Sequence, residues 1–409
     1  MTKELFTLGD LYVSDFIKGD EQPRGSKHEM KLIWDSKNHA ARLEKAVPIH
    51  TMFGKYWYRS GINTTMVNEL RGIVESITSV MKLKDGDVWL DIACNDGTLF
   101  KFVPKGIFKI GIDPCDDSFA AESRKVADVI VQDYFSKEAY RKTEHHHRKA
   151  KIITTIAMFY DLDDIDSFVQ DIYEVLEDDG MWVIQLSYTP LMIEQLAFDN
   201  ICHEHVYYHS MTSINEIARR NGLKIMDAQL NDVNGGSFRV YMMKDKGDVK
   251  KFGSAPYRDV CRMRVESLLA YEKTSGLGGP EVWKEFFTRI QELKEQTYNF
   301  IKHEKAKGKT VWGYGASTKG NTLLQYFNLD NTLIDGIAER SPYKFGHRTV
   351  GTNIPIYSEE EARKAKPDYM LVLPWHFINE FIVREKDYLD NGGKFIVPCP
   401  KFEIIGKQD

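Results

Sequence analysis

Hydrophobic positions along the chain predict helices and strands in regular alternation. From Thr64 to Met81, apolar residues recur three and four positions apart, which is the spacing of a helix with one buried face. Polar residues and a glycine at 84–87 end this pattern, and the apolar run Val88–Ala93 then predicts a buried strand. The first clear unit of the chain is therefore a helix that leads into a strand.

The same alternation continues to about residue 250. Further strands are predicted at 108–112, 128–131, 151–156 and 181–186, and an amphipathic helix is predicted at 164–176. Two apolar runs, 223–230 and 238–243, flank a glycine-rich turn and predict an antiparallel hairpin. A mostly parallel sheet that ends in such a hairpin is typical of class I methyltransferases, whereas dehydrogenase sheets usually stay parallel.

The remaining chain predicts a second, shorter α/β unit. A helical stretch near 255–307, interrupted at 276–280, comes first, and strands follow at 310–313, 333–338, 368–373 and 394–397. Before residue 55 the sequence predicts only short strands and turns. We expect a small zinc-free N-terminal domain at 1–60, a cofactor-binding methyltransferase domain at 61–250, a helical connector at 251–308 and a Rossmann-like domain at 309–409.

Composition narrows the class of protein. With 409 residues the chain exceeds the usual size of a single core, and 42% hydrophobic and 28% charged residues are ordinary for a globular protein. No apolar run approaches a membrane span, and the start lacks a signal-like segment, so we expect a cytoplasmic protein. The net charge of -5, with no strong basic block, argues against nucleic acid as a partner.

Cysteine and histidine usage gives little sign of a metal centre. The five cysteines are scattered and odd in number, which predicts reduced thiols rather than disulfides. The run His145–His147 predicts a solvated loop, because neighbouring side chains on one segment rarely converge on a single ion.

The turn after the first strand resembles a nucleoside site. Gly97 allows a ligand close to the backbone, and Asp113 at the tip of the next strand is placed to bind a ribose diol. The turn lacks Gly-x-Gly-x-x-Gly, so a dinucleotide fits poorly and S-adenosylmethionine is the favoured ligand. The candidate cofactor residues are Asp91, Ala93, Asn95, Gly97, Asp113 and, for the adenine edge, Asp133. The alternative is that Asp91 and Asn95 only shape a tight turn.

A second turn, Gly313–Gly320, has the composition of a phosphate site. Its hydroxyls, its lysine and the start of a helix all favour a phosphate, although the spacing is not that of a P-loop. Glu339 stands near the position of a ribose-binding acid. The alternative is a degenerate turn that serves only for packing.

The run Cys202–Ser210 is the densest group of polar side chains. Glu204 and His205 follow an apolar helix, and an imidazole there suits proton removal near neutral pH, with tyrosines as hydrogen-bond donors to an oxyanion. Metal binding through His203, His205 and His209 is one alternative, and purely structural hydrogen bonding is another.

These motifs, in this order, resemble those of the sugar C-methyltransferases of deoxysugar biosynthesis, which make mycarose or tetronitrose precursors. The resemblance covers nearly the whole chain, and its markers are Tyr58–Gly61, Asn95–Leu99, His203–His205, Gly235–Arg239, Gly315–Gly320, Lys344, Gly346 and the pair Gly351 and Thr352. It implies S-adenosylmethionine in the central domain and a nucleotide-linked keto sugar between the central and C-terminal domains. The implied reaction removes a proton next to a ketone and methylates the enolate carbon.

The resemblance also implies roles for particular residues. His205 is the expected base, and Glu204 and Tyr58 are expected beside it in the catalytic group. The expected substrate contacts are Tyr56, His203, Ser237, Arg239, Ser317, Thr318 and Lys319, the last three facing the nucleotide diphosphate.

The chain departs from the family at three places. Members usually open with a zinc domain built on paired cysteines, but no cysteine precedes Cys94 and 35–38 replaces one pair, so no zinc is expected. Cys202 stands where a tyrosine is common, and Tyr160 where a histidine is common. These changes bear on the substrate more than on the cofactor.

Three other functions remain open from the sequence. An O- or N-methyltransferase acting on a nucleotide sugar or related molecule needs no acidic carbon proton. A non-catalytic binding protein can retain the same fold. An NAD-dependent oxidoreductase is the least favoured, because the C-terminal turn lacks a third glycine and a clear ribose-binding acid.

Overall fold

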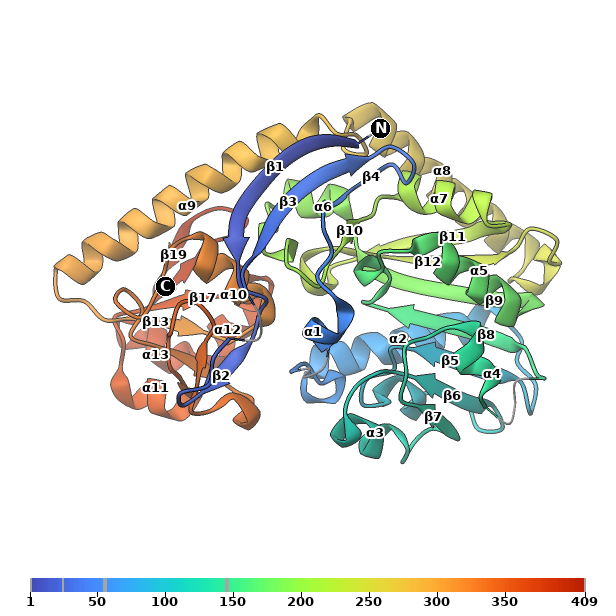
Figure 1. Ribbon diagram of the computed structural model, residues 1–409, viewed down its shortest axis with the longest axis horizontal. Helices are drawn as coiled ribbons and strands as arrows, with labels where there is room; N and C mark the ends of the chain where they lie inside the picture. Colours follow the sequence, from blue (N-terminus) through green and yellow to red (C-terminus); the bar gives the residue numbers. More distant parts are fainter. Residues whose placement is uncertain (1, 24–25, 54–56, 144–146, 408–409) are drawn as a thin grey trace.

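The computed structural model describes residues 2–23, 26–53, 57–143 and 147–407. Two α/β units lie side by side, and a curved N-terminal sheet extends over both of them (Figure 1). Within the described ranges, no helix has the length and apolar character needed to cross a membrane.

A seven-stranded sheet forms the larger unit. Its strand order is β11 (Leu223–Asn231), β12 (Ser237–Lys244), β9 (Leu176–Ser187), β8 (Ala150–Ile156), β5 (Val88–Ile92), β6 (Phe108–Ile112) and β7 (Val129–Val131). Neighbours from β9 to β7 run parallel, while β12 is antiparallel to both β9 and β11. The predicted parallel sheet with a terminal antiparallel hairpin is confirmed.

Helices cover both faces of this sheet. One face packs on α2 (Thr64–Val80), and the other packs on α5 (Ile165–Val175) and α7 (Met211–Arg220). The Asn63 side chain accepts hydrogen bonds from the backbone N–H groups of Thr65 and Met66 and so starts α2 at the expected residue. Smaller helices of this unit are α3 (Asp117–Ser123), α4 (Lys137–Arg141) and α6 (Thr189–Glu194).

Strand β9 differs from the prediction at its start. It begins at Leu176 rather than at Met181, so that residues 177–180, which were assigned to no element, lie within the strand. Its pairing with β8 is irregular there, because Ala150 pairs with Leu176 and Ile152 with Met181. The polar, glycine-containing segment thus interrupts the pairing without ending the strand.

The C-terminal unit is a six-stranded sheet. Its order is β16 (Ile356–Ser358), β14 (Gly336–Glu339), β13 (Val311–Tyr314), β17 (Tyr369–Val372), β18 (Lys394–Val397) and β19 (Glu403–Ile405). All neighbours are parallel except β18 and β19. Its helices are α10 (Thr318–Tyr326), α11 (Glu359–Ala365), α12 (Ile378–Arg384) and α13 (Lys386–Asp390). The predicted Rossmann-like unit is confirmed, with the short strands β16 and β19 added at its edges.

The N-terminal strands join the two units. Strands β1 (Thr2–Leu11), β3 (His28–Asp35) and β4 (Ala40–Leu43) form an antiparallel sheet whose last strand is β10 (Tyr207–Tyr208). The short strand β2 (Phe16–Lys18) pairs instead with β15 (His347–Thr349) of the C-terminal unit. A short helix, α1 (Ile49–Phe53), follows and lies between the units (Figure 1).

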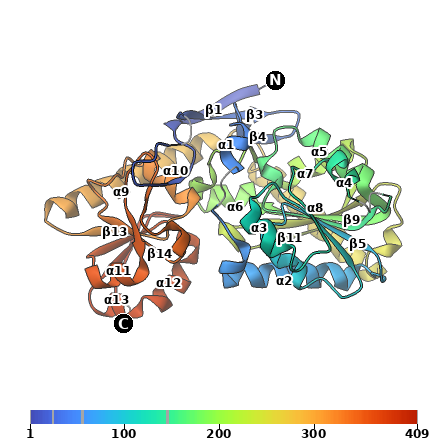
Figure 2. The ribbon, with the colours of Figure 1, turned by 60° about the horizontal axis from the view of Figure 1, so that its bottom comes forward.

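Two long helices link the units along the outside. Helix α8 (Ala255–Ser275) packs against β11 and α7, whereas α9 (Val282–Ala306) runs along β1 toward the C-terminal sheet (Figures 1 and 2). Trp283 and Ile290 of α9 share one continuous core with Phe6 of β1 and Val311 of β13. The N-terminal sheet and the C-terminal unit are therefore held by the same apolar packing.

Candidate active site

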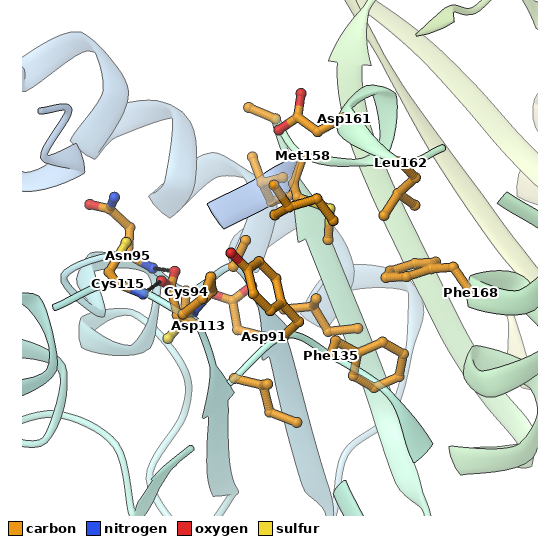
Figure 3. Close-up of a pocket in the computed structure, with 18 of the residues that line it drawn as sticks. Asp91, Cys94, Asn95, Asp113, Cys115, Phe135, Met158, Asp161, Leu162 and Phe168 are labelled. Atoms are coloured by element: carbon orange, nitrogen blue, oxygen red, sulfur yellow. Dashed lines mark hydrogen bonds between the residues drawn. The ribbon is translucent and has the colours of Figure 1, made fainter. Parts of the chain in front are cut away.

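A cavity of about 490 Å³ opens at the carboxyl ends of β5, β6 and β8. One side carries Asp91 and Asp113, and the opposite side carries the apolar groups Phe135, Leu162 and Phe168 (Figure 3). The volume lies within the range of about 300–1,000 Å³ that is usual for small-molecule sites. We call this the first cavity.

The turn after β5 has an unusual backbone. Ala93 and Asn95 adopt φ values of 58° and 52°, a left-handed conformation that is uncommon for residues with a side chain. Asp113 holds this conformation, since its carboxylate accepts the N–H of Asn95 at 2.7 Å and the N–H of Cys115 at 2.8 Å (Figure 3). Such strain persists only where the surroundings enforce it, and it is frequent at functional sites.

The Asn95 and Asp96 side chains fix a second segment above the turn. Asn95 Oδ1 accepts the N–H of Ser60, Asn95 Nδ2 donates to the Tyr58 carbonyl, and Asp96 Oδ2 accepts the N–H of Gly61. The Tyr58 side chain is thereby placed between the first cavity and a second one. The Asn95 side chain thus holds the segment 58–61 by hydrogen bonds, while the Asn95 backbone forms part of the cavity wall.

Asp91 is a buried carboxyl group in the wall of the first cavity. Thr154 Oγ1 donates a hydrogen bond to it at 2.6 Å. Burial, together with the nearby charge of Asp113, raises the pKa of Asp91 to about 7, against the lowering effect of the Thr154 bond. Among the described residues, no positive group near Asp91 stabilises its ionised form.

Two predicted cofactor residues lie outside the first cavity. Gly97 has φ of 74°, and a Cβ atom there would stand 2.8 Å from Ser123 Cα and from Val126 Cγ2. The close approach that requires glycine is thus to the protein itself. Asp133 is partly exposed and pairs with Lys142 at 2.9 Å, while the following residues Tyr134 and Phe135 line the cavity instead.

The second cavity, of about 460 Å³, lies between the segment 57–65 and the C-terminal unit. Ser317, Thr318 and Glu339 line it. Glu339 repeats the arrangement of Asp113: one oxygen accepts the N–H of Ala316 in the preceding turn, and the other accepts the N–H groups of Arg340 and Ser341. Both α/β units therefore use an acid at the tip of the second strand to hold the turn of the first.

Positive charge is available at the second cavity. Lys344 and Arg384 line it but are paired with Glu339 and with Glu359 and Glu380, respectively. The guanidinium groups of Arg59 and Arg340 also line it and form no ion pair with a described carboxylate. These two arginines are the cations best able to accept an anionic ligand.

His205 is buried and has a defined tautomer. Its Nδ1 lies 2.8 Å from the backbone carbonyl of Asn200, so Nδ1 carries the proton and Nε2 is left as an acceptor. Burial, reinforced by the charge of Lys319, lowers the pKa of His205 to about 3. The Tyr160 ring packs on the imidazole with 4.1 Å between ring centroids. His205 is therefore a neutral imidazole with one basic nitrogen.

Lys319, from the C-terminal unit, contacts Asn200, the residue whose backbone carbonyl holds this histidine. Its Nζ donates to Asn200 Oδ1 at 2.5 Å, and it does not line the second cavity as Ser317 and Thr318 do. This placement differs from the expected position at a diphosphate. The reason is that Lys319 is in the first turn of α10, where its side chain points across the boundary between the units.

The Lys319 charge acts on two buried carboxyl groups. Burial raises the pKa of Asp161 well above its usual value, the Glu204 charge raises it further, and the Lys319 charge opposes both. Burial likewise raises the pKa of Asp199, again against the effect of Lys319. Asp161 also lines the first cavity, which places this group of charges beside the cofactor-sized space.

Other predicted site residues have structural contacts. His203 is buried against His28 of β3, and His209 Nδ1 lies 2.9 Å from Ser213 Oγ. Arg239 pairs with Glu69 at 2.7 Å and with Gln185, and Ser237 donates to the Val233 carbonyl. None of these four residues lines either cavity, and Tyr56 lies outside the described residues. Cys202 is also buried, with its carbonyl accepting the N–H of His205.

Asp161 and Asn200 were missed from the sequence. Asp161 follows the end of β8, and acids at the carboxyl ends of parallel strands are a signal that points to such a site. Asn200 lies in an irregular segment, and its role depends on contacts with Lys319, which no local pattern reveals. Among the described residues no cluster of three or more His, Cys, Asp or Glu side chains is arranged to hold a metal ion.

A doubly wound sheet with a terminal antiparallel hairpin and a nucleoside-sized cavity at its first strands defines a class I methyltransferase. Family models agree: residues 67–228 match a methyltransferase domain, and residues 232–400 match a C-methyltransferase C-terminal domain. The C-methyltransferase NovU of Streptomyces niveus is 27% identical over 408 residues, which cover 99% of this chain and 94% of that protein. The recognition made from the motifs is confirmed: the chain is an S-adenosylmethionine-dependent methyltransferase that is similar to a C-methyltransferase over nearly its whole length.

Solved structures with lower similarity are also methyltransferases. The mitomycin 7-O-methyltransferase MmcR is 14% identical, with 45% of this chain and 55% of that chain covered and a TM-score of 0.35. An S-adenosylmethionine-dependent methyltransferase from Clostridium acetobutylicum is 12% identical, with 44% and 92% covered and a TM-score of 0.33.

Proposed function

We propose that the enzyme methylates a carbon atom of a nucleotide-linked keto-deoxysugar, after removing a proton next to the ketone. The observation that carries the proposal is the state of His205, a neutral imidazole whose Nε2 is free to accept a proton. A base is needed for carbon methylation, because a carbon next to a ketone must lose a proton before it can act as a nucleophile. The relation to NovU, a C-methyltransferase by name, supports the same reaction class.

The residues of the first cavity fit S-adenosylmethionine. Asp113 at the tip of β6 is placed for the ribose hydroxyls, and Phe135 and Phe168 offer an apolar wall to the adenine. Asp91, whose ionised form lacks a positive neighbour, suits the ammonium of the methionine part. The bound cofactor supplies an electrophilic methyl group with a neutral thioether as its leaving group.

The second cavity suits the nucleotide part of the substrate. Arg59 and Arg340, which form no ion pair with a described carboxylate, provide two guanidinium groups for a diphosphate, and the hydroxyl of Thr318 adds a hydrogen-bond donor. Tyr58 lines both cavities, so a sugar that extends from the second cavity past Tyr58 comes close to the methyl donor. This arrangement accounts for two α/β units in one enzyme.

Incubation of the purified protein with S-adenosylmethionine and a panel of nucleotide-linked keto-deoxysugars tests the proposal. We expect a product with a new carbon-bound methyl group, seen by nuclear magnetic resonance. A product methylated only at oxygen or nitrogen contradicts the proposal. Exchange of the substrate's carbon proton with deuterated solvent, without cofactor, separates the two reaction types because only carbon methylation requires that step.

The affinity for the cofactor is expected to increase with pH through the titration of Asp91. This carboxyl group, with a pKa of about 7, is half protonated at neutral pH and must ionise to pair with the ligand's ammonium. Binding of S-adenosylhomocysteine should therefore strengthen about tenfold between pH 6 and pH 8 and release a proton near pH 7. Calorimetry in buffers of different ionisation enthalpy measures both effects.

Two carboxyl variants complete this test. The change Asp91→Asn should remove the pH dependence, whereas Asp133→Asn, which alters a partly exposed carboxyl outside the cavity, should keep it. Equal affinity at pH 6 and pH 8 in the unaltered protein would rule out the pairing of Asp91 with the ligand.

A further inference from the structure

We propose that Lys319 is a catalytic residue whose ammonium binds the ketone oxygen of the substrate and stabilises the negative charge formed there when His205 removes the neighbouring proton. The proposal rests on the function proposed above. It assigns Lys319 to the reacting carbonyl group, in place of the nucleotide diphosphate that the turn composition favours.

One residue holds both the base and the lysine. The backbone carbonyl of Asn200 accepts a hydrogen bond from His205 Nδ1, and the side-chain Oδ1 of Asn200 accepts one from Lys319 Nζ. The imidazole belongs to the methyltransferase unit and the ammonium to the C-terminal unit. Asn200 thus binds two groups that are far apart in the sequence. In the substrate, the ketone group is directly bonded to the carbon that loses its proton. A base for that carbon and a cation for the ketone oxygen must therefore be held close together, and Asn200 holds both.

The Lys319 ammonium donates a hydrogen bond to an uncharged group, the side-chain amide of Asn200. Lys319 forms no ion pair with a described carboxylate, although it is only partly exposed. An ammonium that is held by an amide oxygen keeps its charge available, and two of its three N–H donors remain for an oxygen of the substrate. A lysine placed only to neutralise a buried acid would instead be expected in direct contact with that acid.

The charge of Lys319 affects several titratable groups in the same region. The Lys319 charge lowers the pKa of both His205 and His376 and opposes the raised pKa of Asp161 and of Asp199. Asp161 Oδ1 and Asp199 Oδ1 have no hydrogen-bond partner among the described residues. The ammonium is thus the positive centre of a partly desolvated region that contains the base and a wall of the first cavity.

The proton-transfer step balances. The C–H bond next to the ketone breaks and its proton moves to Nε2 of His205, while its electron pair forms the carbon–carbon double bond. The carbonyl π pair moves onto oxygen, which becomes an oxyanion paired with the ammonium. When the carbon takes the methyl group, the carbonyl re-forms and the pair of the carbon–sulfur bond stays on sulfur. A preorganised cation is effective here because its position costs no reorganisation during the reaction.

The variants Lys319→Gln and Lys319→Arg test the proposal through two readouts. In the first, the unaltered enzyme exchanges the substrate's carbon proton with deuterated solvent in the presence of S-adenosylhomocysteine, and Lys319→Gln should slow this exchange about 10²–10³-fold. In the second, kcat for methylation should fall by the same factor while KM for the sugar changes only a few-fold. Lys319→Arg, which keeps the charge at a different position, should give intermediate rates.

The matched control is Lys364→Gln, which removes an exposed lysine of α11 and should change neither rate. An unaltered kcat in Lys319→Gln together with a large increase in KM would overturn the proposal in favour of phosphate binding. Absence of carbon methylation by the unaltered enzyme would refute the proposed function itself, so the two failures are distinguishable. Calorimetric binding of S-adenosylhomocysteine shows that each variant is folded.

Two further measurements separate catalysis from structure. The acid limb of the kcat/KM profile should move to higher pH in Lys319→Gln, because loss of the ammonium raises the pKa of His205. The variant Asn200→Ala keeps the lysine and the backbone carbonyl that holds His205 but removes the oxygen that positions the ammonium. If Lys319→Gln does not fold, Asn200→Ala decides: slower solvent exchange supports the proposal, and an unchanged rate overturns it.

Discussion

Replacing His205 by glutamine is expected to lower kcat for carbon methylation by about 10²–10⁴-fold, the usual contribution of a general base. The amide cannot take up the proton that Nε2 accepts, while its size still fills the buried site next to Tyr160. The affinity for S-adenosylhomocysteine should stay unchanged, because His205 does not line the first cavity. Steady-state kinetics and calorimetry on the same preparation measure the two quantities.

His209→Gln is the matched control for this variant. His209 is more deeply buried and belongs to the same run, but its Nδ1 contacts Ser213 and it lines neither cavity. This change should lower the thermal stability and leave kcat within a few-fold of the unaltered enzyme. A loss of kcat in His209→Gln as large as that in His205→Gln would show that the whole run acts structurally.

The pH profile of the unaltered enzyme follows from the same residue. A histidine with a lowered pKa is neutral above that value, and the neutral form is the active base. With a pKa of about 3, His205 stays active throughout the range of about pH 5–8, so its titration should not limit kcat there.

The change Asp113→Ala is expected to weaken cofactor binding by about 10²–10⁴-fold. In the proposed complex the ribose would lose two hydrogen bonds to this carboxylate, each worth about 1.5–3 kcal/mol for a charged acceptor. The backbone N–H groups of Asn95 and Cys115 would also lose their acceptor, which frees the strained turn after β5. Calorimetry with S-adenosylhomocysteine measures the loss.

Glu339→Ala makes the equivalent change in the C-terminal unit. Glu339 holds the turn after β13 as Asp113 holds the turn after β5. This variant should keep the affinity for S-adenosylhomocysteine and increase KM for the nucleotide sugar, because it alters only the second cavity. Weaker cofactor binding in Glu339→Ala would contradict the assignment of the two cavities to separate ligands.

The α/β units could be predicted because their signals are local. Buried parallel strands are short apolar runs, and the helices between them have one apolar face, so each element is visible within a window of the sequence. The hairpin of β11 and β12 was equally clear from its glycine-rich turn. The tip positions of Asp113 and Glu339 followed from the strands that precede them.

The N-terminal sheet could not be predicted because its pairing is long-range. Strand β4 pairs with the two residues Tyr207 and Tyr208, and β2 pairs with β15 near residue 348. No local pattern identifies partners at such separation. The same limit applies to Lys319, whose turn has the composition of a phosphate site but whose side chain is directed by Asn200.

Arg239 and Gly97 contact other protein residues, whereas ligand contacts were predicted for them, and the reason is a different one. Both residues occur in motifs of the family, and a motif does not distinguish a residue that touches a ligand from one that holds the fold. Arg239 is engaged by Glu69 and Gln185, and Gly97 by the backbone at Ser123. Burial and hydrogen bonding decide between these roles, and both require the structure.

The pairing of β2 with β15 has a consequence for biosynthesis. All strands of the methyltransferase sheet have left the ribosome once Lys244 has emerged, and this sheet can then form. Strand β2 has to wait for residues 347–349, so its backbone edge stays open while most of the chain is being translated. The residues that line the first cavity, the last of which is Asp171, are therefore all made long before the last of those that line the second cavity, which extend to Arg384. The two cavities are completed in order along the chain as it is synthesised.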